Sequence, residues 1–153
     1  MIRVAGALEE RIKADTVVAL KAGDKQRTQA LRLLTAALKK ERIDAGKTPD
    51  EAEEIVVLKR ERKRRLEAAE IYAGAGRDEL AARERYEEEL IVVYLPAELG
   101  DDELAAIVDE TIAETGAATP RDMGKVMGAV MKKVAGRADG GQVNRLVRSR
   151  LGG

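Results

Sequence analysis

The side chains best suited to binding a ligand are basic residues in the C-terminal third of the chain. From Arg121 to Gly153 there are eight basic and two acidic residues, whereas Glu98 to Glu114 contains seven acidic residues and no basic one. Cations beside glycines and helix ends can hold phosphate groups. We therefore predict a phosphate-binding surface for RNA, made of Lys125, Lys132, Lys133, Arg137, Arg145 and Arg148.

A second set of residues in the same segment is predicted to shape its backbone. Gly124 and Gly128 stand in a predicted helix, where each glycine costs roughly 0.5–1 kcal/mol relative to alanine. This cost indicates a close approach to the helix, either by a neighbouring helix or by the backbone of a ligand. Packing within the fold is the favoured interpretation. Gly136 and Gly140 are expected to form an adaptable loop, and Asp139 to cap the next helix.

The same segment lacks two other means of binding nucleic acids and nucleotides. No aromatic residue follows Pro96, so a base has no ring on which to stack. The chain also lacks a Walker pattern and a GxGxxG motif after a strand, which argues against a nucleotide pocket. Binding here is expected to depend on the phosphate backbone and on shape rather than on base sequence.

The composition excludes several kinds of catalysis. The chain has no histidine and no cysteine, which removes the commonest general base, the thiolate nucleophile and the usual zinc ligands. Carboxylates do cluster at residues 87–89 and 101–103. Their pattern is typical of solvated helix faces and helix N-termini. We therefore expect no enzymatic activity, no metal and no cofactor.

The densest basic run, residues 59–65, has two interpretations. It could form a phosphate-binding helix face. The favoured interpretation is a solvated helix with charges that pair along it, because acids precede the run and Glu61 and Arg65 have the spacing of an i,i+4 ion pair.

Hydrophobic spacing and capping residues predict an all-α fold. Only three residues are aromatic, all of them tyrosine, and a core of Leu, Val, Ile, Ala and Met packs best between helices. Thr48 and Thr119 each precede a proline and stand three residues before an acid, as N-caps do. Helices are expected over about residues 4–21, 24–45, 48–72, 78–95, 101–115, 119–134 and 139–151.

Two apolar stripes are assigned to the core. One lies on the third expected helix, and the other, on the sixth, consists of methionines at every fourth position. The first stripe is Ile55, Leu58, Leu66 and Ala69, and the second is Met123, Met127 and Met131 with the neighbouring valines.

Two domains are expected. The N-terminal domain, residues 1–96, has about four long helices, and the C-terminal domain, residues 97–153, has three short ones. The sequence shows no signal peptide and no apolar stretch of membrane-spanning length. We therefore expect a cytoplasmic protein that does not bind membranes.

Three stretches of the C-terminal segment, residues 119–128, 133–140 and 143–144, resemble the signature of the GatB/YqeY family. Tyr94-Leu95-Pro96, followed by an acidic helix start, is similar to the middle of YqeY proteins, and residues 32–41 are similar to their second helix. The resemblance covers essentially the whole chain. It implies an all-helical fold of two parts.

The resemblance also implies a link to tRNA. The C-terminal part is similar to the tail of GatB, the amidotransferase subunit whose tail contacts tRNA, but the catalytic cradle of GatB has no counterpart here. The family label of carbon–nitrogen ligase with glutamine as amido donor therefore reaches this chain by association only. Two hypotheses follow: an adaptor that binds tRNA or another structured RNA, and a protein–protein adaptor for an amidotransferase or an aminoacyl-tRNA synthetase.

Overall fold

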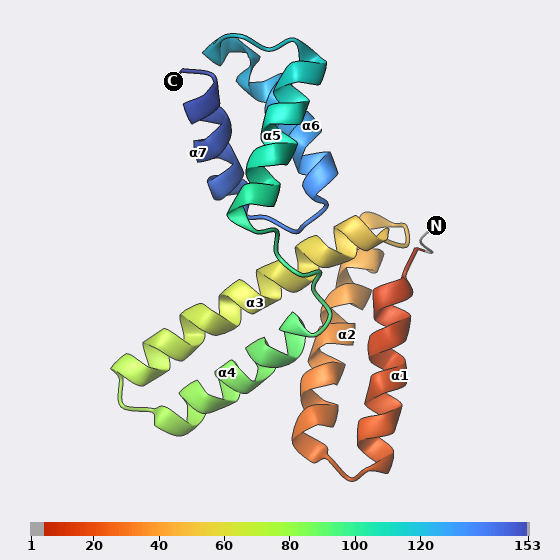
Figure 1. The fold of residues 1–153 in the computed structure, drawn as a ribbon. Helices are drawn as coiled ribbons and strands as arrows, with labels where there is room; N and C mark the ends of the chain where they lie inside the picture. The colour runs from red at the N-terminus through yellow and green to blue at the C-terminus, as the bar shows by residue number, and fades with distance from the viewer. Residues whose placement is uncertain (1–4, 153) are drawn as a thin grey trace. The chain divides into compact units, whose positions relative to one another are not determined.

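The computed structural model describes residues 5–152 and contains no strand within that range, which confirms the all-α prediction. Short joints, several of them at glycines in the left-handed region, separate the helices. In chain order the helices are α1 (Ala7–Lys21), α2 (Lys25–Ala45), α3 (Glu51–Gly74), α4 (Asp78–Val92), α5 (Asp101–Thr115), the 3₁₀ turn η1 (Pro120–Asp122), α6 (Met123–Val134) and α7 (Gly140–Arg150) (Figure 1).

The helices group into two compact units, one ending at Leu95 and the other starting at Pro96. We call them the N-terminal unit, with α1 to α4, and the C-terminal unit, with α5 to α7. Each has a hydrophobic core of its own. None of the helices within residues 5–152 is both long and apolar enough to cross a membrane.

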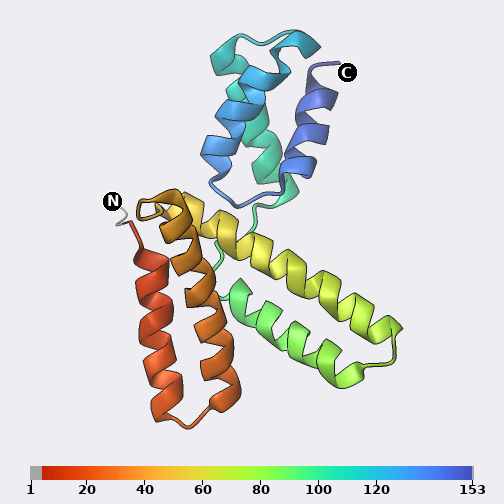
Figure 2. The same cartoon turned by 180° about the vertical axis from the view of Figure 1, so that it is seen from behind.

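The N-terminal unit consists of two helical hairpins. Helix α1 lies beside α2, and α3 lies beside α4, as Figures 1 and 2 both show. Apolar residues spaced three or four apart on α2 face the centre of the unit. The core contains fully buried Ile12, Leu31, Leu34 and Leu58, and buried Tyr94 closes it at the end of the unit.

The predicted core stripe of α3 is correct except at one position. Ile55, Leu58 and Ala69 are buried, but Leu66 is 41% exposed, so its assignment to the core is wrong. The second half of α3 runs away from α2 with α4 alongside it (Figures 1 and 2). Because fewer neighbouring helices cover this half, only a narrow strip of it is buried.

The helix starts agree with the predicted caps at two of three positions. Thr119 and Asp122 form the predicted capping box, and Asp139 accepts a hydrogen bond from the backbone N–H of Gln142 at the start of α7. The cap of α3 is Asp50, which forms a capping box with Glu53, so the prediction of Thr48 is wrong. The buried Pro49 is instead held by its carbonyl, which accepts a hydrogen bond from the N–H of Gly6.

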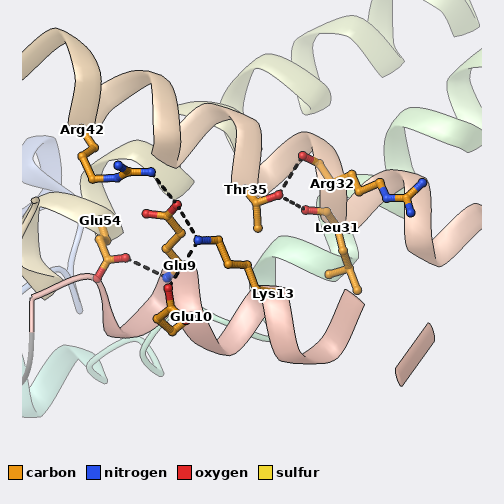
Figure 3. Close-up of polar contacts among 8 residues, drawn as sticks. All are labelled: Glu9, Glu10, Lys13, Leu31, Arg32, Thr35, Arg42 and Glu54. Carbon is orange, nitrogen blue, oxygen red and sulfur yellow. Dashed lines mark hydrogen bonds and ion pairs between the residues drawn. The ribbon is translucent and has the colours of Figure 1, made fainter. Parts of the chain in front are cut away.

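The start of α1 is stabilised by a carboxylate from α3. Glu54, 1% exposed, accepts a hydrogen bond from the backbone N–H of Leu8 at 3.3 Å. It accepts a second from the backbone N–H of Glu9 at 2.8 Å (Figure 3). The Glu9 carboxylate turns toward Arg42 and Lys13, at 3.3 and 3.4 Å. Negative charge at a helix N-terminus satisfies unpaired N–H groups and the helix dipole together. This contact joins α1 to α3 across 46 residues of sequence.

In the C-terminal unit three short helices pack around valines. Val126, Val130 and Val134 are fully buried at every fourth position of α6, which places one face of the helix against its neighbours. The methionines lie beside this stripe. Met123 and Met127 are partly buried against the core, and Met131 is exposed, so the prediction of a methionine core stripe is wrong for Met131.

Candidate nucleic-acid interface

The C-terminal unit separates its charges by helix. Helix α5 carries six acidic residues and no basic one, whereas α6 and α7 carry three basic residues each and no acidic one. Five of the six predicted phosphate-binding residues lie on α6 and α7, and Arg137 lies in the loop between them. The acids of α5 can therefore neutralise part of the basic surface, and the bonds of each cation decide which part.

Two of the predicted residues on α6 bond to α5. The Lys133 ammonium lies 2.7 Å from Glu114 and 4.0 Å from Glu110, and it holds the pKa of the Glu114 carboxyl below its usual value. The Lys125 ammonium donates to the carbonyl of Thr115 at 3.2 Å, in the last turn of α5, where a cation complements the helix dipole. Both side chains therefore help to fasten α6 to α5.

Arg137 also has a bond within the unit. Its Nε donates to the carbonyl of Ala97 at 3.0 Å, and its own carbonyl accepts from the N–H of Leu99 at 2.7 Å. These two bonds hold the segment before α5 against the loop before α7. Any phosphate contact by Arg137 would have to use the other nitrogens of the guanidinium group.

Three of the predicted residues are exposed and have no bonding partner among the described residues. Lys132 on α6 and Arg145 and Arg148 on α7 make no hydrogen bond or ion pair with any residue of the described range. Sequence reasoning omitted Arg121, which is also exposed and without such a bond. It lies in the 3₁₀ turn η1, directly before α6, and its place four residues before Lys125 could be read from the sequence.

The two glycines of α6 lie on the same outward face. A Cβ added to Gly124 or Gly128 would have nothing within 4 Å, and both residues are exposed. The favoured prediction, that they allow close packing within the fold, is therefore wrong. This face of α6 therefore has no side chain at the two glycines and carries cations at Lys125 and Lys132.

The remaining residues of the predicted backbone motif have structural roles. Gly136 has a φ of 82° and follows Ala135, whose φ is 47°, so the chain turns after α6 through two left-handed residues. A Cβ on Gly140 would lie 3.9 Å from the Met131 side chain. Asp139 caps α7. This loop sets the direction in which α7 leaves α6.

The exposed cations of this unit are groups that can hold anions. No group of three or more His, Cys, Asp or Glu side chains within residues 5–152 could hold a metal ion. Asp122, directly before α6, accepts hydrogen bonds from the backbone N–H groups of Ala118 and Thr119, which lower its pKa. The lowered pKa makes this carboxylate a weaker proton acceptor than an ordinary aspartate, and its hydrogen bonds are those of a helix cap.

The basic run of α3 differs from the C-terminal surface. Its arginines are bonded to acids of α2, α3 and α4: Arg60 to Glu41, Arg62 to Glu88, Arg64 to Glu61 and Arg65 to both Glu61 and Glu87. The favoured interpretation, a solvated helix with charges that pair along it, is correct only in part. The predicted Glu61–Arg65 pair is present at 3.9 Å. Most of the pairing, however, is with acids of α2 and α4, and Arg65 is mostly buried.

Comparison with known proteins gives a family for the chain. A family model described as "Yqey-like protein" matches residues 9–151. A search of curated proteins gave no match. The matched range covers most of both units and contains all the exposed cations described above. The chain therefore belongs to the YqeY-like protein family.

Proposed function

We propose that this chain is a cytoplasmic adaptor that binds tRNA or another structured RNA through phosphate contacts on the outward faces of α6 and α7. The observation that carries the proposal is the set of three cations, Lys132, Arg145 and Arg148, that are exposed and unbonded within the described chain on two helices without acids. Exposed cations without partners are the groups that release counterions when phosphates bind.

The neighbouring residues define how the RNA would be held. Lys125, Lys133 and Arg137 are bonded within the unit and would contribute mainly by raising the local positive potential. No aromatic ring is present in this unit, so recognition would depend on the backbone and on shape. The chain would position RNA and leave chemistry to an associated enzyme, in keeping with the resemblance of its C-terminal part to the GatB tail.

The test is binding of labelled bulk tRNA, measured by fluorescence anisotropy at several salt concentrations. We expect the intact protein to bind with a log–log salt slope of about −2 to −3, since each of three phosphate contacts contributes about −0.7 to −0.9. The variant Lys132→Glu/Arg145→Glu/Arg148→Glu should bind at least about a hundredfold more weakly, because three attractions become repulsions.

A matched control changes the same number of charges elsewhere. Lys21, Lys39 and Lys63 are exposed lysines of the N-terminal unit without a bond to the described residues, and their reversal to glutamate gives the same change in net charge. If the two triple variants weaken tRNA binding equally, binding responds to net charge alone, and the proposed binding surface on α6 and α7 is refuted. Absence of binding by the intact protein would refute the function.

The alternative function is a protein–protein adaptor for an amidotransferase or an aminoacyl-tRNA synthetase. It is favoured by one observation, an open groove over α2, α3 and α4 whose lining includes two exposed leucines, Leu33 and Leu80. The two functions separate in a pull-down, since an association with protein survives nuclease treatment and one bridged by RNA does not.

A further inference from the structure

The acidic helix of the C-terminal unit lies against both of its basic helices. Helix α5 packs on α6 and on α7, and Figures 1 and 2 show it beside α6. Asp109 of α5 forms an ion pair with Arg150 of α7 at 2.8 Å. Glu110 and Glu114 of α5 form ion pairs with Lys133 of α6. The acids of α5 therefore hold one cation of each basic helix.

Lys133 is the cation that two acids share. Its Nζ lies 2.7 Å from Glu114 and 4.0 Å from Glu110. The side chain of Lys133 is 33% exposed, and both carboxylates are more than half exposed. Ion pairs at such a surface contribute little to stability, so a phosphate could replace the carboxylates at a small cost. Lys133 is thus available to a phosphate only in competition with Glu110 and Glu114.

The position of Lys133 brings this competition to the edge of the proposed RNA surface. Lys132 and Lys133 are consecutive on α6, and successive residues point about 100° apart around a helix. Lys133 reaches α5, whereas Lys132 is exposed and bonds to no residue of the described chain. A phosphate held by Lys132 therefore lies on the side of α6 next to Lys133 and its acids. The two carboxylates occupy one cation there and repel the phosphate as well.

We propose that Glu110 and Glu114 limit the affinity for RNA by keeping Lys133 from contacting phosphate. The inference rests on the proposed function and identifies a competitor of RNA within the fold itself. Three cations then contact RNA in the intact protein, and loss of the two carboxylates adds Lys133 as a fourth. Weak binding suits an adaptor that must release its RNA, since differences in affinity arise mainly in the dissociation rate.

The test is anisotropy of labelled bulk tRNA with full-length variants at several salt concentrations. Glu110→Gln/Glu114→Gln removes both charges at nearly constant side-chain size. We expect roughly fivefold tighter binding and a log–log salt slope steeper by about 0.7–0.9, because one more cation contacts phosphate. The matched control is Glu98→Gln/Glu103→Gln, the same change at two exposed acids of this unit without an ion pair in the described chain. It should leave the slope unchanged.

A double-mutant cycle assigns the gain to Lys133. Lys133→Met in the otherwise intact protein should weaken tRNA binding by less than about twofold, because this cation is already paired. The same change added to Glu110→Gln/Glu114→Gln should remove the whole gain of roughly fivefold and restore the original salt slope. Circular dichroism establishes that each variant is as helical as the intact protein.

The outcomes separate this inference from the proposed function. Suppose the intact protein binds tRNA and Glu110→Gln/Glu114→Gln binds no more tightly than the control. The inference is then overturned and the function is retained. Equal weakening by Lys133→Met in both backgrounds would show that Lys133 contacts phosphate despite its acids, and this too would overturn the inference. No tRNA binding by the intact protein would refute the function and the inference together.

Discussion

The basic run of α3 and the basic faces of α6 and α7 look alike in sequence and differ in the fold. In α3, each of the four arginines bonds to a carboxylate, and three of the four reach an acid on another helix. On α6 and α7, Lys132, Arg145 and Arg148 reach none in the described chain. The arginines of the denser run are therefore all paired, and only its lysines lack an acid in the described chain.

The difference comes from the neighbouring helices. Helices α2 and α4 present Glu41, Glu87 and Glu88 toward α3. The acidic α5 reaches only the edge of the basic surface, at Lys133 and Arg150. A basic side chain is held within the fold when a neighbouring helix places an acid beside it. A basic cluster is available for a ligand only where no such element lies next to it.

The largest effect on stability is expected when a paired arginine of α3 is removed. Arg65→Met keeps most of the apolar stem and leaves Glu61 and Glu87 mostly buried without their cation. We expect a loss of about 2–4 kcal/mol in the free energy of unfolding, because uncompensated buried charges are costly. The measurement is urea unfolding followed by circular dichroism.

The matched change on the other surface is Arg148→Met. It removes an exposed cation without a partner, so stability should change by less than about 0.5 kcal/mol. Similar losses in the two variants would remove the distinction between paired and unpaired cations.

RNA binding should show the opposite order. Neutralising Lys132 and Arg148 together with glutamine should make the log–log salt slope of tRNA binding less steep by roughly 1.5, since about 0.7–0.9 is lost with each phosphate contact. Neutralising Arg60, whose partner is Glu41, should leave the slope unchanged. A larger effect from Arg60→Gln would move the interface to α3.

The sequence predicted the fold class and most elements because they depend on local signals. The capping box at Thr119, the cap at Asp139 and the buried positions Ile55 and Leu58 all follow from spacing along one helix. The sequence did not predict the Asp50 cap, because Pro49 accepts a hydrogen bond from the backbone N–H of Gly6, a residue distant in sequence. Leu66 was misassigned because spacing does not reveal how far a neighbouring helix extends.

The candidate site could be predicted only as a set of residues. Spacing grouped six cations in one segment, but it could not show that Lys133 meets Glu114 or that Arg137 holds Ala97, since both partners come from a separate part of the chain. The Glu54 contact to Leu8 and Glu9 had no sequence signal for the same reason. Side-chain partners across helices are fixed by packing, which the sequence pattern describes only coarsely.

A smaller effect is expected at the exposed glycines of α6. Gly124→Ala and Gly128→Ala should each raise the free energy of unfolding by about 0.5–1 kcal/mol, because alanine is the better helix former and the added Cβ meets no atom. Thermal unfolding measures the change. Gly116→Ala is the control, and it should destabilise the protein, since Gly116 has a φ of 68°. A loss of stability at Gly124 or Gly128 would indicate a close contact on this face.

The smallest effects are expected from pH, and the two units should respond in opposite directions. Burial raises the pKa of Glu54 above its ordinary value of 4.5, and the charge of Glu9 adds to this. A raised pKa in the folded state means that stability is greatest below 4.5 and decreases as pH rises through the raised value. Lys133 lowers the pKa of Glu114, so the stability from that pair is present above 4.5 and is lost as pH falls through the lowered value.

Carboxyl ¹³C titration by NMR measures both groups in one experiment. We expect the Glu54 midpoint above 4.5 and the Glu114 midpoint below it. Lys133→Met should return the Glu114 midpoint toward its ordinary value and leave Glu54 unchanged, because the two groups belong to separate units. Glu54→Gln retains one acceptor oxygen for the N–H groups of α1 and cannot ionise, so it should remove the decrease in stability with rising pH. A Glu54 midpoint below 4.5 would show that its two hydrogen bonds outweigh the desolvation of the carboxylate.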